Sequence, residues 1–301
     1  MRLITRSDFD GLACGALLES LGLVSEWLFV HPKDIQDGLV EATKNDIVAN
    51  VPYIHGCGLW FDHHSSEEER LGYDVKFEGV SRKAPSCARV IYDYYGGEQK
   101  LGKFAEMIKY VDKMDSADLT EDEIKNPSGW VLLGFITDPR TGLGRLHNFT
   151  ISNFELMKKL AKDAFSKPIN EILESSDIKE RVVAYFEQNA YFIDMVKKYA
   201  RIEGKAIYVD LRDVETIHAG NRFLLYTLFP EQNISIWVVD GKKKVNTVIT
   251  VGYSVINKTS TVNVGSLMLK YGGGGHRAVG TCQVACEDTN RIIGEILAAV
   301  K

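Results

Sequence analysis

The sequence predicts an α/β protein made of two domains, each built around its own β-sheet. The chain has 301 residues, which is more than a single hydrophobic core usually organises. Short β-type runs alternate with helical patterns in its first part, which is typical of a parallel sheet covered by helices. A long, charged and periodic segment follows at 177–200, and β-type runs resume after it.

The first part opens with a strand, a loop and a helix. Residues 2–5 form a short apolar run, residues 7–11 are polar and contain Gly11, and residues 12–21 form an apolar helical pattern that Gly22 ends. Further β-type runs are expected at 27–30, 46–51 and 58–61, and helices at 84–95, 101–114, 130–136 and 153–164.

The segment at 177–200 is predicted to be a helix that links the two domains, because its apolar residues recur at helical spacing among charged ones. Strands are expected beyond it at 205–211, 235–239 and 245–253, and helices at 221–229 and 288–300. We therefore expect a first domain at 1–176, a linker helix at 177–200 and a smaller α/β domain at 201–301.

Composition narrows the classes of function. The net charge of −5 argues against a surface that coats nucleic acid, because such surfaces bind many phosphates through Lys and Arg. No segment approaches the roughly 20 apolar residues that span a bilayer, and the first residues lack the apolar run of a signal peptide. A cytoplasmic protein with a small or short anionic partner, and with no membrane partner, is the expectation.

Two carboxylates follow the first strand. Asp8 and Asp10 lie where the strand ends and the helix begins, which is the edge where ligands bind in parallel α/β sheets. Two carboxylates at this edge would attract a hard divalent cation. The alternative is that one of them only caps the helix, a position that Asp often takes.

A second polar motif, Asp62-His63-His64, follows the β-type run at 58–61. One carboxylate and two imidazoles together suit Mn²⁺ or a similar divalent ion. A triplet of this kind alone is more often not a metal site, because adjacent side chains do not all converge on one point. The two upstream carboxylates strengthen the interpretation.

These motifs, with Gly272-Gly273-Gly274-Gly275-His276 downstream, resemble the DHH/DHHA1 phosphoesterases in order and spacing over nearly the whole chain. That superfamily includes exopolyphosphatase-related proteins, RecJ-type exonucleases, nano-RNA and pAp phosphatases, and cyclic dinucleotide phosphodiesterases. The chain looks most like the exopolyphosphatase-related branch. The resemblance implies a metal-binding DHH domain at 1–176 and a substrate-binding DHHA1 domain at 201–301.

The resemblance also implies a set of metal ligands. An Asp after the third helix of the site completes this set in the family, and Asp112 matches it here, with Asp115 and Asp138 as weaker candidates. A solvated helix end is the alternative for Asp112. One or two Mn²⁺ ions are expected, with Mg²⁺ or Co²⁺ as substitutes. The full predicted set of ligands is Asp8, Asp10, Asp62, His63 and Asp112.

The chain departs from the family pattern at two positions. The family usually has a His just before the first Asp, where this chain has Ile4 and Arg6, and an Asp before the DHH motif, where it has Asn50. Losing these ligands should weaken one of two metal positions. We expect Arg6 to supply positive charge and bind phosphate, with Asn50 also contacting substrate. An Arg that is only ion-paired is the alternative.

The glycine run is predicted to bind phosphate. Gly273, Gly274 and Gly275 free backbone N–H groups to approach an anion, and His276 and Arg277 follow directly. A flexible turn is the alternative. The segment at 138–145 carries two arginines, and we interpret it as the exit loop of a packed helix rather than as part of the cleft.

Together these features predict a metal-dependent phosphoesterase that hydrolyses a phosphodiester, phosphomonoester or phosphoanhydride bond. Asp62, His64 and Arg6 are the expected catalytic residues, and His64 would contact the phosphate or stabilise the leaving oxygen. The substrate would be a small phosphorylated molecule or a short single-stranded oligonucleotide. A homodimer is a further expectation that no motif supports. The alternative is a catalytically impaired nucleotide-binding or regulatory protein of the same fold.

Overall fold

The structure is a computed structural model, and it describes residues 1–64, 75–146 and 148–300. The chain divides into two compact units. The first comprises Met1–Leu119 and Asn126–Phe186, and the second comprises Thr120–Lys125 and Glu187–Lys301. Each unit contains its own sheet, as the sequence predicts, and the α/β fold class is therefore confirmed.

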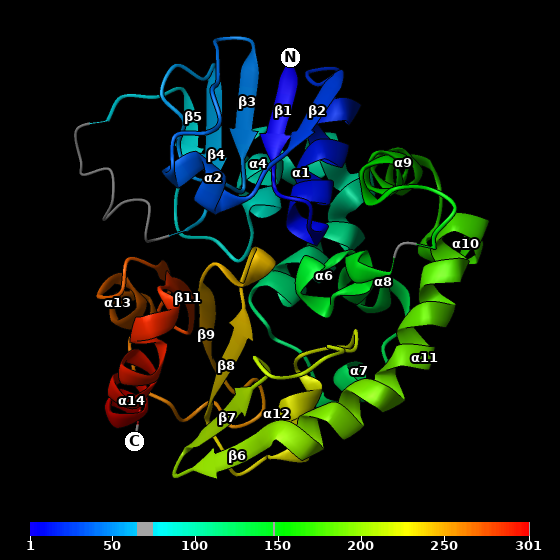
Figure 1. Ribbon diagram of the computed structural model, residues 1–301. Helices are drawn as coiled ribbons and strands as arrows, with labels where there is room; N and C mark the ends of the chain where they lie inside the picture. Colours follow the sequence, from blue (N-terminus) through cyan, green and yellow to red (C-terminus); the bar gives the residue numbers. More distant parts are fainter. Residues whose placement is uncertain (65–74, 147, 301) are drawn as a thin grey trace. The chain divides into compact units, whose positions relative to one another are not determined.

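The described residues of the first unit form a five-stranded sheet in the order β2-β1-β3-β4-β5, and every pair of neighbours is parallel (Figure 1). This order places β1, which precedes Asp8, beside β3, which precedes Asn50. The strands are β1 (Arg2–Thr5), β2 (Glu26–Phe29), β3 (Asp46–Ala49), β4 (Leu59–Asp62) and β5 (Gly79–Ser81).

The strands β1 to β4 send alternate side chains to two separate cores. Leu3 on β1 and Ile47 on β3 lie in the larger core, whereas their neighbours Ile4 and Val48 lie in the smaller one on the opposite face. Apolar residues on both faces explain why the strands read as continuous hydrophobic runs in the sequence.

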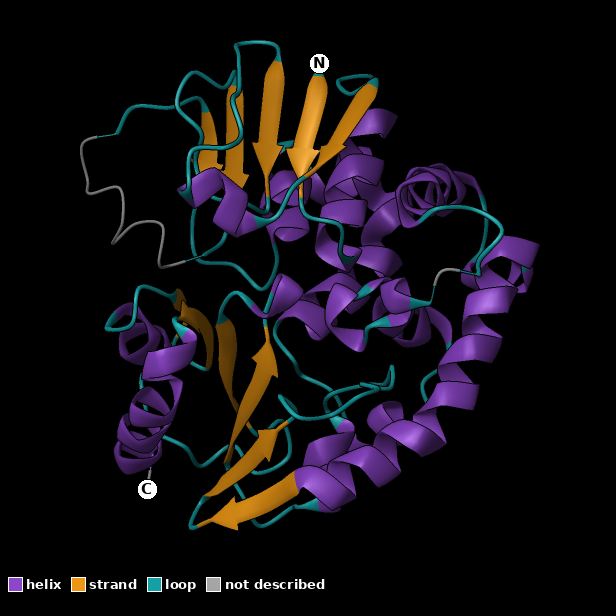
Figure 2. Ribbon diagram, viewed as in Figure 1, coloured by secondary structure: helices purple, strands orange, loops and turns teal. Residues whose placement is uncertain are grey.

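Helices cover both faces of the sheet. Figure 2 shows α1, α4 and α9 on one face and the short α2 on the other. Helix α1 begins at Asp8, whose side chain accepts a hydrogen bond from the Gly11 N–H, and α9 begins with a capping box of Ser152 and Glu155. The helices are α1 (Phe9–Ser20), α2 (Pro32–Gln36), α4 (Cys87–Tyr94), α5 (Gly97–Leu101), α6 (Ala105–Asp115), α8 (Gly129–Thr137), α9 (Asn153–Ser166) and α10 (Ile169–Glu174).

The second unit contains a six-stranded mixed sheet in the order β10-β11-β9-β8-β7-β6. Only the β7–β8 pair is parallel among its described strands. Helices α13 and α14 bury their apolar faces against this sheet. The elements are α7 (Glu121–Lys125), β6 (Ala200–Glu203), β7 (Ala206–Asp210), α12 (Leu224–Leu228), β8 (Ile234–Asp240), β9 (Thr247–Tyr253), α13 (Val264–Leu269), β10 (Gly274–His276), β11 (Val279–Val284) and α14 (Thr289–Val300).

The predicted linker helix is present as α11 (Ser176–Tyr199), and the two units divide within it, between Phe186 and Glu187. The short helix α7 packs with the second unit, where the side chain of Asn221 donates a hydrogen bond to the Ile124 carbonyl at 3.2 Å. No local pattern in the sequence indicates that α7 packs with the second unit. The predicted domain limits of 1–176, 177–200 and 201–301 stay a prediction.

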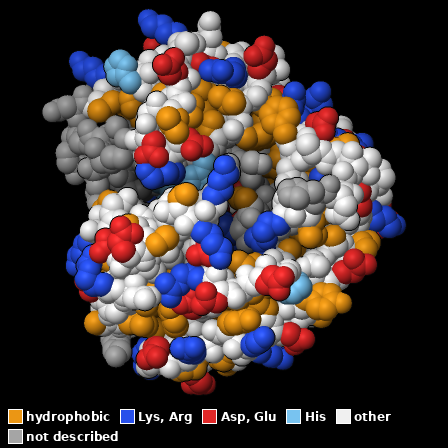
Figure 3. Space-filling view, viewed as in Figure 1, with side chains coloured by type: hydrophobic (Ala, Val, Ile, Leu, Met, Phe, Trp, Pro, Cys, Tyr) orange, Lys and Arg blue, Asp and Glu red, His pale blue; other side chains and the backbone are white. Residues whose placement is uncertain are grey.

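The surface carries both signs of charge. The face drawn in Figure 3 shows acidic and basic side chains intermixed with apolar ones, in keeping with the net charge of −5. None of the described helices is both long and apolar enough to cross a bilayer.

Candidate functional site

The first candidate residues lie at the carboxyl edge of the parallel sheet. Strand β1 ends at Thr5, Asp8 caps α1, and Asp10 lies in the first turn of that helix. Asp10 is only 2% exposed. The short loop between strand and helix therefore holds both carboxylates at the edge where the sequence predicts a ligand.

Asp10 is held by the N-terminus of α4. The N–H of Ala88 donates to Oδ1 at 2.7 Å, and the N–H of Cys87 donates to Oδ2 at 2.9 Å. The first N–H groups of a helix lack partners within the helix and carry partial positive charge, so they suit a carboxylate. These contacts fix the position of Asp10.

His63 faces two carboxylates. Its Nδ1 lies 3.2 Å from the Ala84 carbonyl, which accepts only if Nδ1 carries the proton. Its Nε2 lies 3.2 Å from Oδ2 of Asp115 and 3.7 Å from Oδ2 of Asp10. In the neutral ring Nε2 is then a lone-pair donor, which is the arrangement of a histidine that binds metal through Nε2.

Asp10, His63 and Asp115 form one group of potential ligands, which we call the Asp10 cluster. One ligand atom from each lies within 4.8 Å of the others. Burial, together with the negative charges of Asp115 and then Asp8, raises the pKa of Asp10 well above its usual range, although the N–H groups of α4 oppose this. A divalent cation among these atoms would offset the repulsion, so the residues fit a metal site.

Asp62 and His64 lie next to this cluster at the end of β4. Asp62 is fully buried, and its Oδ1 lies 2.7 Å from Nδ1 of His64. Within the part of the chain that the structure describes, Oδ2 of Asp62 has no hydrogen-bond partner. A buried carboxylate oxygen without a partner is costly unless a cation or water satisfies it.

The Asp62 carboxylate also changes the charge of His64. Burial lowers the pKa of His64, but the charge and hydrogen bond of Asp62, with the charge of Asp115, raise it to about 9. In the absence of a metal, His64 is therefore an imidazolium at neutral pH and donates to Asp62 through Nδ1.

Asp112 does not face the Asp10 cluster. Its Oδ1 accepts a hydrogen bond from the Ser86 hydroxyl at 2.7 Å, and its Oδ2 accepts from Nε and Nη2 of Arg89 at 2.9 and 2.8 Å. Both oxygens are committed to α4. The geometry thus favours Asp115, which the sequence indicates less strongly, over Asp112 as the carboxylate that joins His63.

Besides capping α1, Asp8 contacts Asn50 and Arg6, two residues that depart from the family pattern. The side-chain amide of Asn50 donates to Oδ1 at 3.0 Å, and Nε of Arg6 lies 3.1 Å from Oδ2. Asn50 is only 3% exposed and has a left-handed backbone with φ of 58°. The contact of Asn50 with substrate stays a prediction, and in this structure its side-chain amide binds Asp8.

Asp138, another candidate ligand, caps the turn that follows α8. Its Oδ1 accepts hydrogen bonds from the backbone N–H and from Nε of Arg140, both at 2.8 Å. Asp138 is not part of the Asp10 cluster.

Comparison with known proteins places this geometry in a family. No protein-family model and no curated protein matches the sequence. Among solved structures, the pGpG-specific phosphodiesterase PggH from Vibrio cholerae is 44% identical, with 99% of this chain and 98% of that chain covered and a TM-score of 0.79. The chain belongs to the DHH/DHHA1 phosphoesterases.

Two other solved structures are less similar. RecJ from Thermus thermophilus in complex with Mn²⁺ is 13% identical, with 99% of this chain and 51% of that chain covered and a TM-score of 0.45. A putative family II inorganic pyrophosphatase from Methanococcus jannaschii is 14% identical, with 100% and 99% covered and a TM-score of 0.28.

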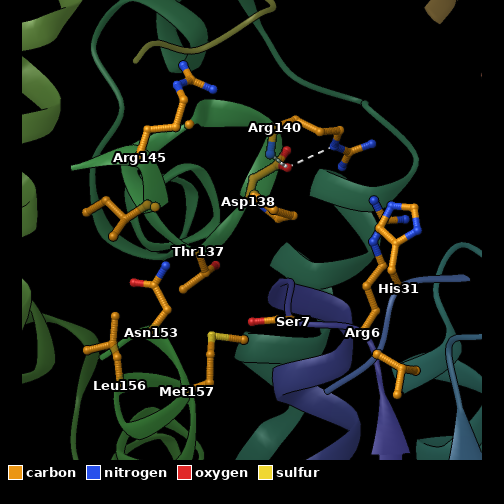
Figure 4. A pocket seen from close by; sticks show the side chains of 15 residues that line it. Arg6, Ser7, His31, Thr137, Asp138, Arg140, Arg145, Asn153, Leu156 and Met157 are labelled. Atoms are coloured by element: carbon orange, nitrogen blue, oxygen red, sulfur yellow. Dashed lines mark hydrogen bonds and ion pairs between the residues drawn. The ribbon is translucent and has the colours of Figure 1, made fainter. Parts of the chain in front are cut away.

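The DHH domain of this phosphoesterase contains a pocket of about 470 Å³ next to Asp8, which we call the arginine pocket (Figure 4). The segment at 138–145 is the exit loop of α8, as the sequence predicts, and it also lines this pocket together with Arg6. Its walls comprise Arg6, Ser7, Val30, His31, Ile136, Thr137, Asp138, Pro139, Arg140, Gly142, Gly144, Arg145, Asn153, Leu156 and Met157.

The glycine run of the DHHA1 domain closes a helix. The N–H of Gly272 donates to the Leu269 carbonyl, and the N–H of Gly273 donates to the Met268 carbonyl. Gly272 has a left-handed backbone with φ of 73°, so the end of α13 is a Schellman motif. The N–H groups of these two glycines are therefore already used, and they are not free to hold a phosphate.

The rest of the run is the edge strand β10, which pairs with β11. A Cβ on Gly275 would lie 2.2 Å from the Val279 carbonyl oxygen, so this glycine is required for the close approach of the two strands. His276 follows in the same strand, and Arg277 is exposed directly after it. The packing explains the glycines, and His276 and Arg277 remain as the candidate side chains of this unit.

Proposed function

We propose that this phosphoesterase hydrolyses the internal phosphodiester of a short 5′-phosphorylated oligonucleotide such as pGpG, using a divalent ion held by Asp10, His63 and Asp115. The Asp10 cluster carries the proposal, because it combines two carboxylates with an imidazole of fixed tautomer. The identity of 44% to a pGpG-specific phosphodiesterase over nearly the full length of both chains supports this class of substrate.

An ion at this cluster would polarise phosphate oxygens and acidify a water molecule. The residues around it have defined tasks. Cys87 and Ala88 hold Asp10 in place through their N–H groups, and Ala84 fixes the tautomer of His63. Asp62, whose Oδ2 has no hydrogen-bond partner among the described residues, extends the negative charge at the end of β4.

His64 is the proposed donor to the substrate. The Asp62 carboxylate favours the charged ring, in which Nε2 also carries a proton that can be donated to a phosphate oxygen or to the leaving oxygen. Arg6 adds permanent positive charge at Asp8. In the second unit, His276 and Arg277 are the proposed substrate contacts. Of the predicted phosphate contacts Gly273, Gly274 and Gly275, Gly273 already donates its N–H to Met268, which leaves only N–H groups of β10 that do not pair with β11.

We propose that a single ion binds tightly, with Mn²⁺ preferred and Mg²⁺ or Co²⁺ as substitutes. Asn50 and Arg6 satisfy the oxygens of Asp8 without a cation, so this carboxylate has less need of a second ion. The relationship to a phosphodiesterase favours the enzyme over a catalytically impaired regulatory protein. The exopolyphosphatase-related branch stays a prediction that substrate tests would decide.

Turnover of a substrate panel tests this function. The purified protein is incubated separately with pGpG, pAp, a cyclic dinucleotide and polyphosphate. Each reaction contains Mn²⁺, Mg²⁺, Co²⁺ or a chelator, and the products are separated by chromatography. We expect pGpG to yield mononucleotides only with a divalent ion, and Asp115→Asn to abolish this. Lys179→Ala, which changes an exposed residue of α11, is the matched control. Release of phosphate from polyphosphate alone would replace this proposal with the exopolyphosphatase-related branch.

A further inference from the structure

The arginine pocket has basic side chains gathered on one side. In Figure 4 Arg6, His31 and Arg140 lie on the same side of the pocket, and Arg145 lies at the opposite wall. The three residues come from separate segments, namely the loop after β1, the cap of α2 and the turn after α8. The fold therefore brings together donors that are far apart in the sequence.

Arg6 and Arg140 each use only part of their guanidinium. Arg6 contacts Asp8 through Nε at 3.1 Å, and Arg140 binds Asp138 through Nε at 2.8 Å. Within the described part of the chain, the terminal Nη atoms of these two arginines donate no hydrogen bond. A guanidinium has five N–H donors, so four on each remain for an anion.

His31 adds a further donor. It caps α2, and its Nδ1 accepts a hydrogen bond from the Lys33 N–H at 3.2 Å. In the neutral ring the proton therefore resides on Nε2. Burial, and then the positive charge of Arg6, lowers the pKa of His31, so the ring next to Arg6 is a neutral N–H donor.

The pocket adjoins the Asp10 cluster. Arg6 contacts Asp8, which is two residues from Asp10 in the same loop and helix start. Burial lowers the pKa of Arg140, but the charge and hydrogen bond of Asp138 raise it above its ordinary value. The charges of Asp8 and Asp115 add to this increase, so Arg140 lies within their electrostatic reach.

The remaining walls are suited to a nucleoside. Leu156, Met157 and Ile136 give an apolar surface, and Thr137 and Asn153 offer a few polar atoms. A volume of about 470 Å³ is in the range of pockets that enclose a small organic ligand and is larger than one phosphate needs. An anion with an attached apolar body matches both parts of the pocket.

We propose that the arginine pocket binds the nucleotide that carries the terminal, uncleaved phosphomonoester of the substrate, with Arg6, His31 and Arg140 donating to that phosphate. The proposal rests on the function proposed above, because it assigns a second position on the same substrate. The arginine pocket would make the enzyme specific for substrates with a terminal phosphate, while the Asp10 cluster acts on the internal phosphodiester.

The test compares pGpG with GpG, which lacks the terminal phosphate. We expect the kcat/KM of the wild-type protein with Mn²⁺ to be at least about tenfold higher for pGpG, since charge-assisted contacts to a phosphate are strong. Arg140→Gln should bring this ratio close to one, and Lys179→Ala should leave it unchanged. A wild-type ratio near one, or an Arg140→Gln ratio equal to that of the wild type, would overturn the proposal.

Binding separates this proposal from the function on which it rests. Calorimetric titration of pGpG and GpG, with circular dichroism to check folding, needs no turnover. If neither compound is cleaved, the proposed function fails, while tighter binding of pGpG that is lost in Arg140→Gln still supports the pocket. Equal binding of both compounds overturns it. If Arg140→Gln does not fold, Arg140→Lys replaces it. We expect this variant to prefer pGpG over GpG less strongly than the wild type does, but still measurably.

Discussion

Oδ2 of Asp115 lies 3.2 Å from Nε2 of His63, whereas Asp112, three residues earlier on α6, is bound by Ser86 and Arg89. Two acidic residues of one helix thus have different partners. Asp115 joins the Asp10 cluster, and Asp112 ties α6 to α4.

The first prediction separates these two roles. Asp115→Asn should weaken Mn²⁺ binding by at least about tenfold with little change in the free energy of unfolding, because it removes a charge from the cluster. Asp112→Asn should instead lower the free energy of unfolding by about 1–2 kcal/mol through the loss of its ion pair with Arg89. Calorimetric Mn²⁺ titration and urea unfolding measure the two effects. An Asp112→Asn protein that loses Mn²⁺ binding while staying fully stable would reverse the assignment.

The second prediction concerns Asn50. Asn50→Asp replaces a hydrogen-bond donor to Asp8 with a second carboxylate about 3 Å away, and the two negative charges repel each other. In the presence of a chelator, the melting temperature should therefore fall by about 2–4 °C. Added Mn²⁺ should reverse this loss and bind with a higher stoichiometry than in the wild type. Asn50→Ala, which removes the hydrogen bond without adding charge, should be destabilised with and without Mn²⁺. An unchanged number of bound ions in Asn50→Asp would contradict the role given to Asn50.

The third prediction is a pH dependence in the second unit, away from the metal site. Burial tends to raise the pKa of Asp210, but hydrogen bonds from Arg212 and Tyr208 lower it below its ordinary value. A depressed pKa stabilises the fold above the pKa of the unfolded chain, and this stabilisation is lost as the pH falls through the folded value. Asp210→Asn should therefore cost about 1 kcal/mol at neutral pH and nothing near pH 2.

Urea unfolding between pH 7 and pH 2 measures this difference. The exposed Asp194, also in the second unit, provides the control through Asp194→Asn, which should leave the pH profile unchanged. A constant difference between Asp210→Asn and the wild type at every pH would mean that the ion pair with Arg212 is not its source.

The fourth prediction tests the packing of the glycine run. Gly275→Ala would place a Cβ 2.2 Å from the Val279 carbonyl oxygen at a backbone φ of 149°, so we expect a loss of about 2–4 kcal/mol in the free energy of unfolding. Gly294→Ala is the matched control, because Gly294 lies within α14 with nothing within 4 Å of the new Cβ. It should stabilise by about 0.5–1 kcal/mol. Equal effects of the two substitutions on thermal melting would refute the packing argument.

The sequence predicts which carboxylates lie at the carboxyl edge of the sheet, but it does not predict the contacts that hold them there. The positions of Asp8, Asp10 and Asp62 follow from local patterns, because each lies at the end of a parallel strand or directly after one. The N–H groups that hold Asp10 come from Cys87 and Ala88, far along the chain. No local pattern indicates such a contact, since it depends on how α4 packs against α1.

For two other features, the choice of metal ligand on α6 and the role of Gly272, the sequence contains a signal but is compatible with more than one interpretation. Asp112 and Asp115 are three residues apart on one helix and so lie on neighbouring parts of its surface, and only the position of Arg89 decides between them. Gly272 after the apolar pattern of 264–269 is a helix-ending signal, which could have predicted the Schellman motif. Arg140 lies in a loop whose neighbours in the pocket, such as Arg6 and His31, are distant in the sequence, so no local pattern predicts that they lie together.

The left-handed backbone of Asn50 has an evolutionary consequence. Asn and Asp are the side chains that tolerate this conformation most readily after glycine, and their codons differ by a single nucleotide. One base change therefore exchanges an amide for a carboxylate beside Asp8 without rebuilding the loop. Under the proposed role of Asn50, the number of ions held at the edge of this sheet is a property that selection would adjust in a single mutational step, while the fold around it stays the same.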